Sequence, residues 1–429
     1  MAMFVHIARR VAAYRFALPA GVAGAGLALA LASAAPVLAQ QPPAGAIAAP
    51  GPLAPATRPG HAAAADRAQH LIDRGLDFLK PQLQPDGGWQ KPNEPPGITA
   101  LVLRAFVLHP RYDARTPLVA KGYEKLFSYQ LDTGGIYQDM LANYNTAIAV
   151  SAIAAADEPA FKERLDRAVA FLKQLQWTPG LKGPKGEAVD ENNPWYGGFG
   201  YGRHARPDLS NAQFSIAALH DAGLKPDDPA YKAALAFLSR TQNHSETNDQ
   251  PWAADDGGFA YSPANGGESE AGTFVGPDGT RRARSYGSMT YAGLKSMIYA
   301  GLSREDPRVR AAVDWIRKHW TLDENPAMRE LGADKSRQGL YYYYYVFAHA
   351  LRAYGQPTIT DATGTPHDWR RELIDALSAL QRPDGAWSGD PRWMESNPVL
   401  TTAYAVLALQ AAQQDLGEKP GEARNPKSE

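Results

Sequence analysis

The side chains that most often carry out chemistry are unevenly distributed in this chain of 429 residues. It contains ten histidines and no cysteine. The missing thiol excludes disulfide bonds, thiolate nucleophiles, thioesters, and cysteine-bound zinc or iron–sulfur clusters. The histidines lack the close spacing of metal ligands, so we expect neither a metal ion nor a cofactor; among them are His204, His220, His244, His319, His349 and His367.

Three aspartates are candidates for acid catalysis, which needs a carboxyl group whose protonation is set by its neighbours. Asp208 directly precedes an apolar helical pattern, and Asp255 and Asp256 are adjacent in the sequence. The pair comes just before Gly257 and Gly258, in a turn pattern where aspartate commonly accepts hydrogen bonds from the backbone. All three are therefore weak catalytic candidates, and the pair is typical of a turn.

Five consecutive tyrosines, Tyr341 to Tyr345, begin another helical pattern. On a helix they point in all directions, so about two should face inward and the others should pack against neighbours. Two interpretations stay open: an aromatic core, or a tyrosine-lined cavity joined by polar groups at the starts of other helices. In the second case the ligand-binding candidates are Asn143, Asn145, Asp208, Asn211, Tyr286, Tyr291, Tyr342, Tyr343 and Tyr344.

The ends of the chain differ in composition from its middle. Arg9, Arg10 and Arg15 precede an apolar stretch, and Val37-Leu38-Ala39 fits a cleavage site, so residues 1–39 are predicted to be an export signal. An uncleaved anchor that tethers the protein to a membrane is the alternative. Residues 40–65 indicate a Pro/Ala/Gly-rich linker and residues 415–429 a disordered polar tail. We therefore expect an exported protein, periplasmic or secreted.

The net charge limits the class of partner. The chain has 44 basic and 45 acidic residues. A nucleic-acid-binding protein usually shows a basic excess or a basic stripe. No nucleic-acid partner is expected.

Residues 66–414 repeat one element: an amphipathic helix that ends near glutamine, followed by a glycine turn and usually an aromatic residue. The last interval between the leading glycines is about twice the others, which predicts a hidden unit. In that unit Trp320 replaces the glutamine, and the turn is Gly339-Leu340-Tyr341. Six units result, and the leading glycines of the other five are Gly87, Gly134, Gly197, Gly257 and Gly385.

Each unit contains two kinds of helix. One kind is amphipathic and starts at a proline after a capping or acidic residue; the other, such as 401–409, is apolar almost all round. A helix without a polar face must be surrounded, so six of each kind predict two concentric rings. An open superhelix would need polar end repeats. The proline starts are Thr116-Pro117, Glu158-Pro159, Asp228-Pro229, Asp306-Pro307 and Thr365-Pro366.

The repeat resembles that of squalene–hopene and oxidosqualene cyclases and, more loosely, of protein prenyltransferase β-subunits. The resemblance covers nearly all of residues 66–414. It implies an all-α fold, the (α/α)6 toroid, in which the glutamines and aromatics tie adjacent repeats together. Gln84, Trp89, Gln381 and Trp387 are then structural.

The chemistry of these families is not encoded at the matching residues. The cyclases carry an Asp-x-Asp-Asp-Thr acid segment, whereas Asp208 is the only carboxylate at the corresponding helix starts. The prenyltransferases need a cysteine zinc ligand. A third class with this barrel shape cleaves polysaccharides with two facing carboxylates and aromatic platforms, for which the candidates are Asp208, Asp255, Asp256, Glu268, Glu270, Trp195, Tyr196 and Tyr201.

The longest connecting segments follow the amphipathic helices of the third and fourth units. In a toroid they emerge on one face, where they could wall a mouth of the barrel. We therefore expect a toroid that binds an apolar, isoprenoid-like ligand or a protein partner without cyclase chemistry. The alternative is an enzyme, either a diverged terpene cyclase or mutase or a carbohydrate-active (α/α)6 enzyme.

Overall fold

The structure of the protein, a computed structural model, describes residues 61–183, 186–202, 204–414 and 416. They fall within one compact unit, Thr57–Glu418. The predicted export signal, most of the predicted linker and nearly all of the predicted tail lie outside the described residues. Over the ranges given above, no helix is long and apolar enough to cross a membrane.

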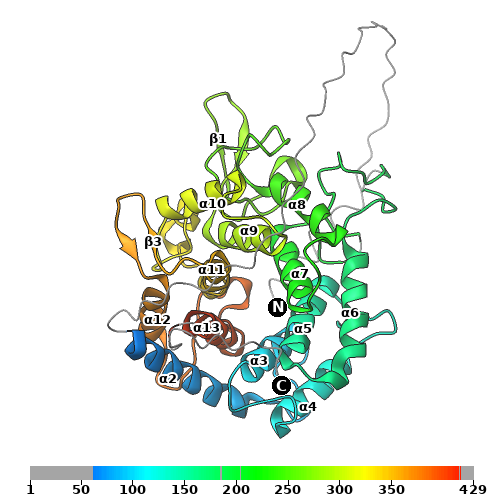
Figure 1. Ribbon diagram of the computed structural model, residues 1–429, viewed down its shortest axis with the longest axis vertical. Coiled ribbons are helices and arrows are strands. Elements are labelled where there is room, and N and C mark those ends of the chain that lie inside the picture. Colours follow the sequence, from blue (N-terminus) through cyan, green and yellow to red (C-terminus); the bar gives the residue numbers. More distant parts are fainter. Residues whose placement is uncertain (1–60, 184–185, 203, 415, 417–429) are drawn as a thin grey trace, which may run out of the picture. The chain divides into compact units, whose positions relative to one another are not determined.

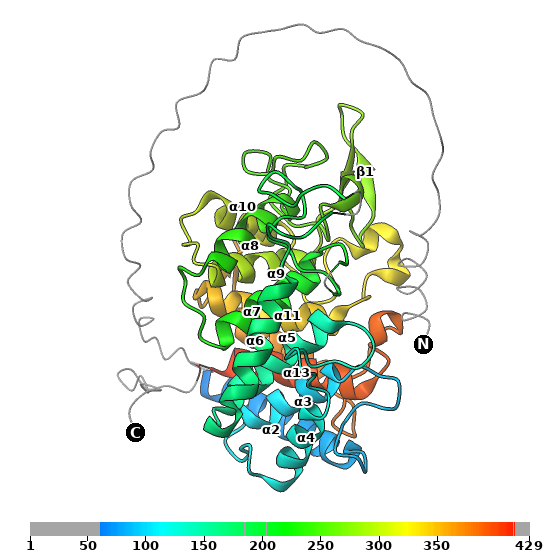
Figure 2. The same ribbon diagram turned by 90° about the vertical axis from the view of Figure 1, so that its right-hand side faces the viewer.

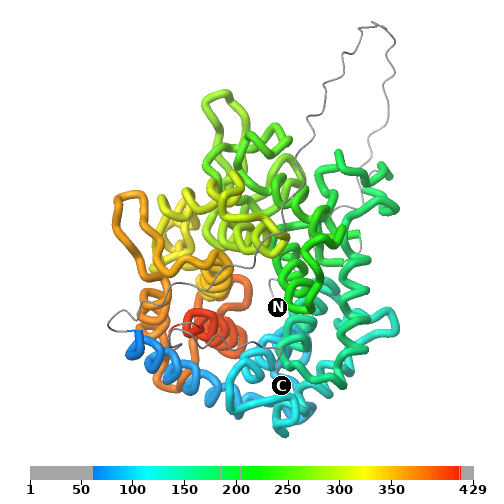
Figure 3. The backbone as a smooth tube through the Cα atoms, in the orientation of Figure 1, coloured from blue at the N-terminus to red at the C-terminus, as the bar shows by residue number. Residues whose placement is uncertain are grey.

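Six helices form an inner ring (Figures 1 and 3). Each contacts the next, and the last contacts the first, so the ring is closed. Their order around the ring is their order in the chain: α3 (Gly97–Val107), α5 (Ala142–Ala156), α7 (Leu209–Asp221), α9 (Gly287–Tyr299), α11 (Leu340–Tyr354) and α13 (Pro398–Gln413).

Six more helices lie outside this ring and alternate with the inner ones along the chain (Figures 1 and 2). The two rings confirm the predicted (α/α)6 toroid. The outer helices are α2 (His61–Leu79), α4 (Pro117–Phe127), α6 (Lys162–Leu175), α8 (Pro229–Thr241), α10 (Pro307–Lys318) and α12 (Trp369–Leu380).

Short elements occupy the connections between helices. Two antiparallel hairpins were not expected from the sequence: β1 (Thr273–Val275) with β2 (Arg281–Ala283), and β3 (Ile359–Thr360) with β4 (Pro366–His367). The 3₁₀ turns are η2 (Lys80–Gln82), η3 (Pro159–Phe161), η4 (Ala264–Gly266), η5 (Met328–Leu331), η6 (Ala333–Lys335) and η7 (Arg392–Met394).

The two kinds of helix pack as their sequences require. In α13 every residue from Val399 to Ala412 is buried, because an apolar helix on the inner ring has neighbours on all sides. In α10 only Val309, Ala312, Trp315 and Ile316 are buried, at the three-to-four-residue spacing of one helical face. Hydrophobic burial thus sorts the helices into the two rings.

Three helix starts differ from the predicted ones. Glu158-Pro159 begins the 3₁₀ turn η3, and α6 follows at Lys162. α2 begins at His61, inside the segment predicted as linker, because Ala62 to Ala65 favour a helix. α12 begins at Trp369 with Asp368 as its cap, whereas Thr365-Pro366 lies at strand β4. The starts after Asp228 and Asp306 are as predicted, and both side chains accept a hydrogen bond from the first turn.

Four repeat glutamines join neighbouring repeats by the same pair of hydrogen bonds. The side-chain amide of Gln176 donates to the carbonyl of Gly197 in its own turn (3.0 Å) and to that of Ala230 in the next outer helix (2.8 Å). Gln130, Gln242 and Gln381 bond in the same way. Gln84 does not, since its amide donates to Gln82 in its own helix end, so its predicted tie to a neighbouring repeat is wrong.

In five of the six units the leading glycine of the turn has a positive φ and touches the next outer helix. At Gly197, for example, φ is 81° and a β-carbon would lie 1.7 Å from the carbonyl oxygen of Ala233. Any side chain would therefore force the two repeats apart. Trp89 and Trp387 complete their turns by donating from the indole to Leu79 and Leu377 of the preceding helix.

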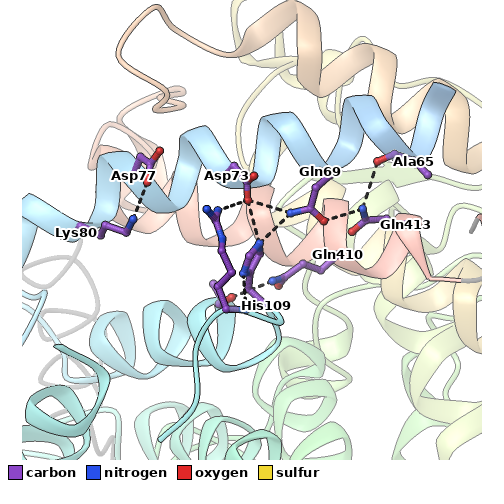
Figure 4. A network of polar contacts seen from close by, with 10 residues as sticks. Ala65, Gln69, Asp73, Asp77, Lys80, His109, Gln410 and Gln413 are labelled. Atoms are coloured by element: carbon purple, nitrogen blue, oxygen red, sulfur yellow. Dashed lines mark hydrogen bonds and ion pairs between the residues drawn. The ribbon is translucent and has the colours of Figure 1, made fainter. Parts of the chain in front are cut away.

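The same contacts close the ring between the last repeat and the first. Gln381 donates to the carbonyl of Leu71 in α2 (3.0 Å). Figure 4 shows a second set of contacts at this junction, where Gln413 of α13 donates to the carbonyl of Ala65 and to Gln69, while Asp73 accepts a hydrogen bond from His109. These contacts join the last repeat to the first and close the ring. An open superhelix would lack them.

Replacing Gln176 by alanine should lower the free energy of unfolding by about 1–3 kcal/mol, because two buried carbonyl groups lose their donor. Urea denaturation measures this. Gln84→Ala is the matched control and should change stability much less, since its amide bonds only locally. Equal losses for the two variants would contradict the role of the paired bond.

Candidate functional site

Aromatic side chains meet across the interior of the inner ring. α7 and α11 are separated in the ring by α9, so contacts between them must cross the interior. Phe214 of α7 lies 6.1 Å from Tyr342 and 5.9 Å from Tyr345 of α11, measured between ring centroids, and both tyrosines also contact Tyr404 of α13. Two of the five consecutive tyrosines therefore face inward, as the helix geometry predicts.

Three of the predicted ligand-binding residues, Tyr291, Tyr343 and Tyr344, have other partners. The hydroxyls of Tyr343 and Tyr344 donate to the carbonyls of Thr321 and Leu322, and Tyr291 packs against the ring of Tyr343. These tyrosines hold the segment between α10 and α11. The inward pair, Tyr342 and Tyr345, is spaced by three residues, about one helical turn, and so lies on one face of the helix.

A buried polar network lies at the start of α7. Asp208 caps this helix by accepting from the backbone nitrogen of Asn211 (2.8 Å) and from its side-chain amide (2.9 Å). Asn143 of α5 donates to Asn211 (3.1 Å) and accepts from Ser215 (2.8 Å). Asn145, in contrast, accepts from the backbone of Gly97 and ties α5 to α3. The structure thus brings three of the predicted polar residues together and separates the fourth.

Five tyrosines gather at the end of the barrel where the inner helices begin, which we call the mouth. This tyrosine cluster consists of Tyr144, Tyr201, Tyr261, Tyr286 and Tyr342. The rings of Tyr144 and Tyr201 are stacked at 6.2 Å, and the hydroxyls of Tyr201 and Tyr261 are 2.8 Å apart. Tyr144, Tyr201 and Tyr342 are partly exposed. The cluster thus combines stacked aromatic rings with hydrogen-bonded hydroxyls, and three of its members are partly exposed.

Asp208 lies beneath the cluster and is fully buried. Burial raises its pKa to about 6, although Arg206 and hydrogen bonds from Asn211 and Tyr261 favour the charged form. Its charge in turn raises the pKa of Tyr201, Tyr261, Tyr286 and Tyr342 beyond the effect of their own burial. A carboxyl group with this pKa holds a proton in weakly acidic solution.

Glu270, at the rim of the mouth, also raises the pKa of tyrosines in the cluster. After burial, which is the larger cause, its charge helps to raise the pKa of Tyr201 and Tyr286, two tyrosines that Asp208 also influences. Its carboxylate pairs with the guanidinium of Arg392 at 2.7 Å, which joins the segment before β1 to the segment before α13. Two carboxyl groups, one buried and one partly exposed, thus lie near the same part of the tyrosine cluster.

The backbone of the mouth is strained. In the described part of the chain, all non-glycine residues with positive φ except Asp157 lie in the segments that lead into inner helices; examples are Leu141 (57°), Ala327 (69°) and Trp393 (54°). Such conformations are often found at binding and catalytic sites. The strain marks the same end of the barrel as the carboxyl groups.

The Asp255-Asp256 pair lies in the predicted turn. Asp256 accepts hydrogen bonds from the backbone of Gly258 (2.9 Å) and from Ser285 (2.7 Å). Asp255 is exposed, and a backbone hydrogen bond from Ser245 lowers its pKa. Asp256 also borders a cavity of about 260 Å³ beside His319. These contacts are those of turn aspartates, and neither residue is placed as a proton donor.

The predicted aromatic platform is only partly at the mouth. Tyr201 belongs to the tyrosine cluster, but Trp195 and Tyr196 pack around Trp177 in a separate small core. Glu268 lies on the rim and pairs with Arg206 at 2.7 Å. Within the ranges that the structure describes, no three histidine or carboxylate side chains converge as metal ligands.

Charged and polar groups continue into the barrel below the mouth. Lys295 of α9 is buried and donates to Gln213 Oε1 at 2.6 Å. Arg104 of α3 crosses the interior to pair with Asp221 of α7 at 3.0 Å. Burial lowers the pKa of Lys295 to about 7. The interior is thus polar as well as aromatic.

Lys295 should make stability depend on pH. Between pH 7 and its ordinary pKa of 10.5, the unfolded chain binds a proton that the folded chain lacks, so the free energy of unfolding should rise with pH relative to Lys295→Met. Urea unfolding from about pH 6 to pH 9 measures the difference. The same change at the exposed Lys232 is the control, and a flat difference for Lys295→Met would contradict the lowered pKa of Lys295.

Comparison with known proteins supports the fold. No protein-family model and no curated protein matches the chain. An α-1,6-mannanase, GH76A of Salegentibacter sp. HEL1_6, is similar in structure with a TM-score of 0.51 at 9% identity, covering 81% of this chain and 99% of that one. This likeness shows the toroid fold alone.

Two further structures are less similar. A variant of the type II terpene cyclase MstE from Scytonema, in complex with its substrate geranylgeranyl dihydroxybenzoate, has a TM-score of 0.48 at 16% identity over 82% of this chain and 99% of its own. A protein from Actinoplanes has a TM-score of 0.44 at 18% identity over 80% and 99%.

Proposed function

We propose that the protein is an enzyme that hydrolyses a carbohydrate at the mouth of the toroid. The observation that carries this proposal is that two carboxyl groups, the buried Asp208 and the partly exposed Glu270, lie close enough to Tyr201 and Tyr286 to raise the pKa of both tyrosines. Glycoside hydrolysis uses such a pair, with one group protonated and the other ionised. Export of the chain is part of the same proposal, since polysaccharides are extracellular substrates.

The hydrogen bonds at the mouth suggest a route for the proton. Tyr261 bonds to Asp208, and its hydroxyl is 2.8 Å from that of Tyr201, which is partly exposed. When Asp208 is protonated, it donates to Tyr261 and Tyr261 donates to Tyr201, so that a proton can pass from Asp208 through these two hydroxyls to the leaving oxygen of the substrate. Glu270 then accepts a proton from the attacking water, so that the overall reaction consumes one water molecule.

The polarity of the mouth favours a carbohydrate over an isoprenoid. A polyene chain offers no hydrogen-bonding groups to the hydroxyls of Tyr144 and Tyr201. Sugars combine hydroxyl groups with apolar ring faces, which suits the partly exposed Tyr144 and Tyr201. A terpene-cyclase function fits these residues less well.

The tyrosines favour hydrolysis over lysis. A tyrosine that serves as the base of a lyase must ionise easily. Burial instead raises the pKa of Tyr144, Tyr201 and Tyr342. These hydroxyls are therefore donors and relays, and the carboxyl groups supply the acid and base.

Glu270→Gln should lower the rate of glycan hydrolysis by about 100-fold or more, because general base catalysis is lost. The release of reducing ends from a panel of polysaccharides measures activity; α-1,6-mannan is the first to test, since the structurally similar mannanase acts on it. Glu268→Gln, on the same rim, is the matched control and should retain activity. Equal rates for the two variants would remove Glu270 from the mechanism.

The pH profile tests the acid. Asp208 donates its proton only when protonated, so activity should fall as the pH rises through about 6, the pKa of this carboxyl group. Asp208→Asn should abolish hydrolysis while its circular dichroism stays that of the folded protein. Activity that rises through this range would contradict the assignment.

A noncatalytic binder of the same ligand is the second candidate. Both carboxylate oxygens of Asp208 already accept hydrogen bonds from Asn211, which is also the pattern of a structural helix cap. Binding of an oligosaccharide without release of products, unchanged in Glu270→Gln, would favour this candidate.

A further inference from the structure

An unbroken series of hydrogen bonds runs from the mouth into the barrel. Tyr144 and Ser210 are 2.6 Å apart, Ser210 and Tyr342 3.1 Å, Tyr342 and Gln213 3.1 Å, and Gln213 and Lys295 2.6 Å. We call these five residues the hydrogen-bond chain. Its outer members, Tyr144 and Tyr342, are partly exposed, whereas Lys295 is 1% exposed.

The buried end fixes the orientation of the amide. An ammonium group only donates hydrogen bonds, so a charged Lys295 requires an acceptor from Gln213. In the structure Gln213 turns its oxygen toward Lys295, which leaves its amide nitrogen to donate to the hydroxyl of Tyr342.

That orientation propagates outward because each hydroxyl has one proton. Tyr342 accepts from Gln213, so its own proton goes to Ser210. Ser210 then donates to Tyr144. In the part of the chain that the structure describes, the proton of Tyr144 meets no acceptor besides Ser210, and that oxygen is already donating toward it.

We propose that the hydrogen-bond chain makes Tyr144 a fixed hydrogen-bond donor to an oxygen atom of the ligand at the mouth. Ser210, Gln213 and Lys295 are positioning residues that act through one another on Tyr144. The ligand class rests on the proposed function, and a sugar hydroxyl or ring oxygen is the acceptor that it supplies. The direction of the chain does not depend on catalysis.

The surroundings of Lys295 are suited to an anchor that keeps its position. The rings of Tyr299 on its own helix and Tyr345 on α11 lie 6.0 and 5.8 Å from its ammonium nitrogen. On α3 and α7, Arg104 and Asp221 carry opposite charges. Buried His349 on α11 has its pKa lowered by burial and by both nearby cations. The nearest charged partners thus largely balance, and Gln213 is the acceptor that Lys295 uses.

Gln213→Glu should reverse the chain while changing the side chain little in shape. A carboxylate accepts from both Lys295 and Tyr342, so Tyr342 would then accept from Ser210, and Ser210 from Tyr144. The intensity ratio of the tyrosine doublet in the Raman spectrum distinguishes a donating from an accepting phenol. Subtracting the spectrum of Tyr144→Phe in each background isolates Tyr144.

We expect the Tyr144 signal to show an accepting phenol in the wild type and a phenol that donates to Ser210 in Gln213→Glu. Identical signals in the two proteins would overturn the proposal. Ser210→Ala is the second variant, in case Gln213→Glu does not fold, and should remove the accepting character of Tyr144; an unchanged signal would again contradict the chain. This measurement needs no ligand, so it is independent of hydrolysis.

The ligand arm uses α-1,6-mannotriose as the probe, with calorimetry as the readout. Tyr144→Phe should weaken binding about tenfold in the wild-type background, the effect of one hydrogen bond, and should have no effect in Gln213→Glu. The same loss in both backgrounds would overturn the role of the chain. A protein that lacks hydrolytic activity but shows this difference would contradict the proposed function and leave the donor role intact.

Discussion

The paired hydrogen bond of the repeat glutamines holds the rings together. In each case one side-chain amide satisfies a carbonyl of its own turn and a carbonyl of the next outer helix, beside a glycine that lets the two backbones touch. Gln381 makes this bond to the first outer helix and so closes the ring. Once the ring is closed, six apolar helices are surrounded on all sides, and the polar groups at their starts are confined to one mouth.

Closure also determines the chemistry that the mouth can support. Asp208 loses contact with water because its helix begins under the tyrosine cluster, and this burial raises its pKa. Glu270 stays at the rim, where Arg392 holds it. The same confinement aligns the hydroxyls of Tyr342 and Tyr144 with the buried Lys295. Burial therefore produces both the proposed acid and the proposed directional donor.

Much of the fold could be predicted from the sequence, because glycine turns, glutamines and apolar helices recur at readable intervals. The candidate site was less accessible. Asp208, Asn143 and Asn211 are recognisable as polar residues at helix starts, but their contacts depend on a register between helices that no local pattern shows. Only the packed structure shows that the hydroxyls of Tyr343 and Tyr344 donate to the backbone of segment 321–322. The sequence around Lys295 does not indicate that this lysine is buried, because its burial results from the closure of the ring.

The central claim is that the mouth, with its tyrosine cluster and two carboxyl groups, is where the ligand binds. Hydrogen–deuterium exchange of the protein with and without a mixture of polysaccharide-derived oligosaccharides tests this claim most directly. We expect slower exchange in segments 199–202, 260–270 and 388–397, which surround the mouth. Protection confined to the cavity beside Asp256 and His319, or to the outer helices, would contradict the claim.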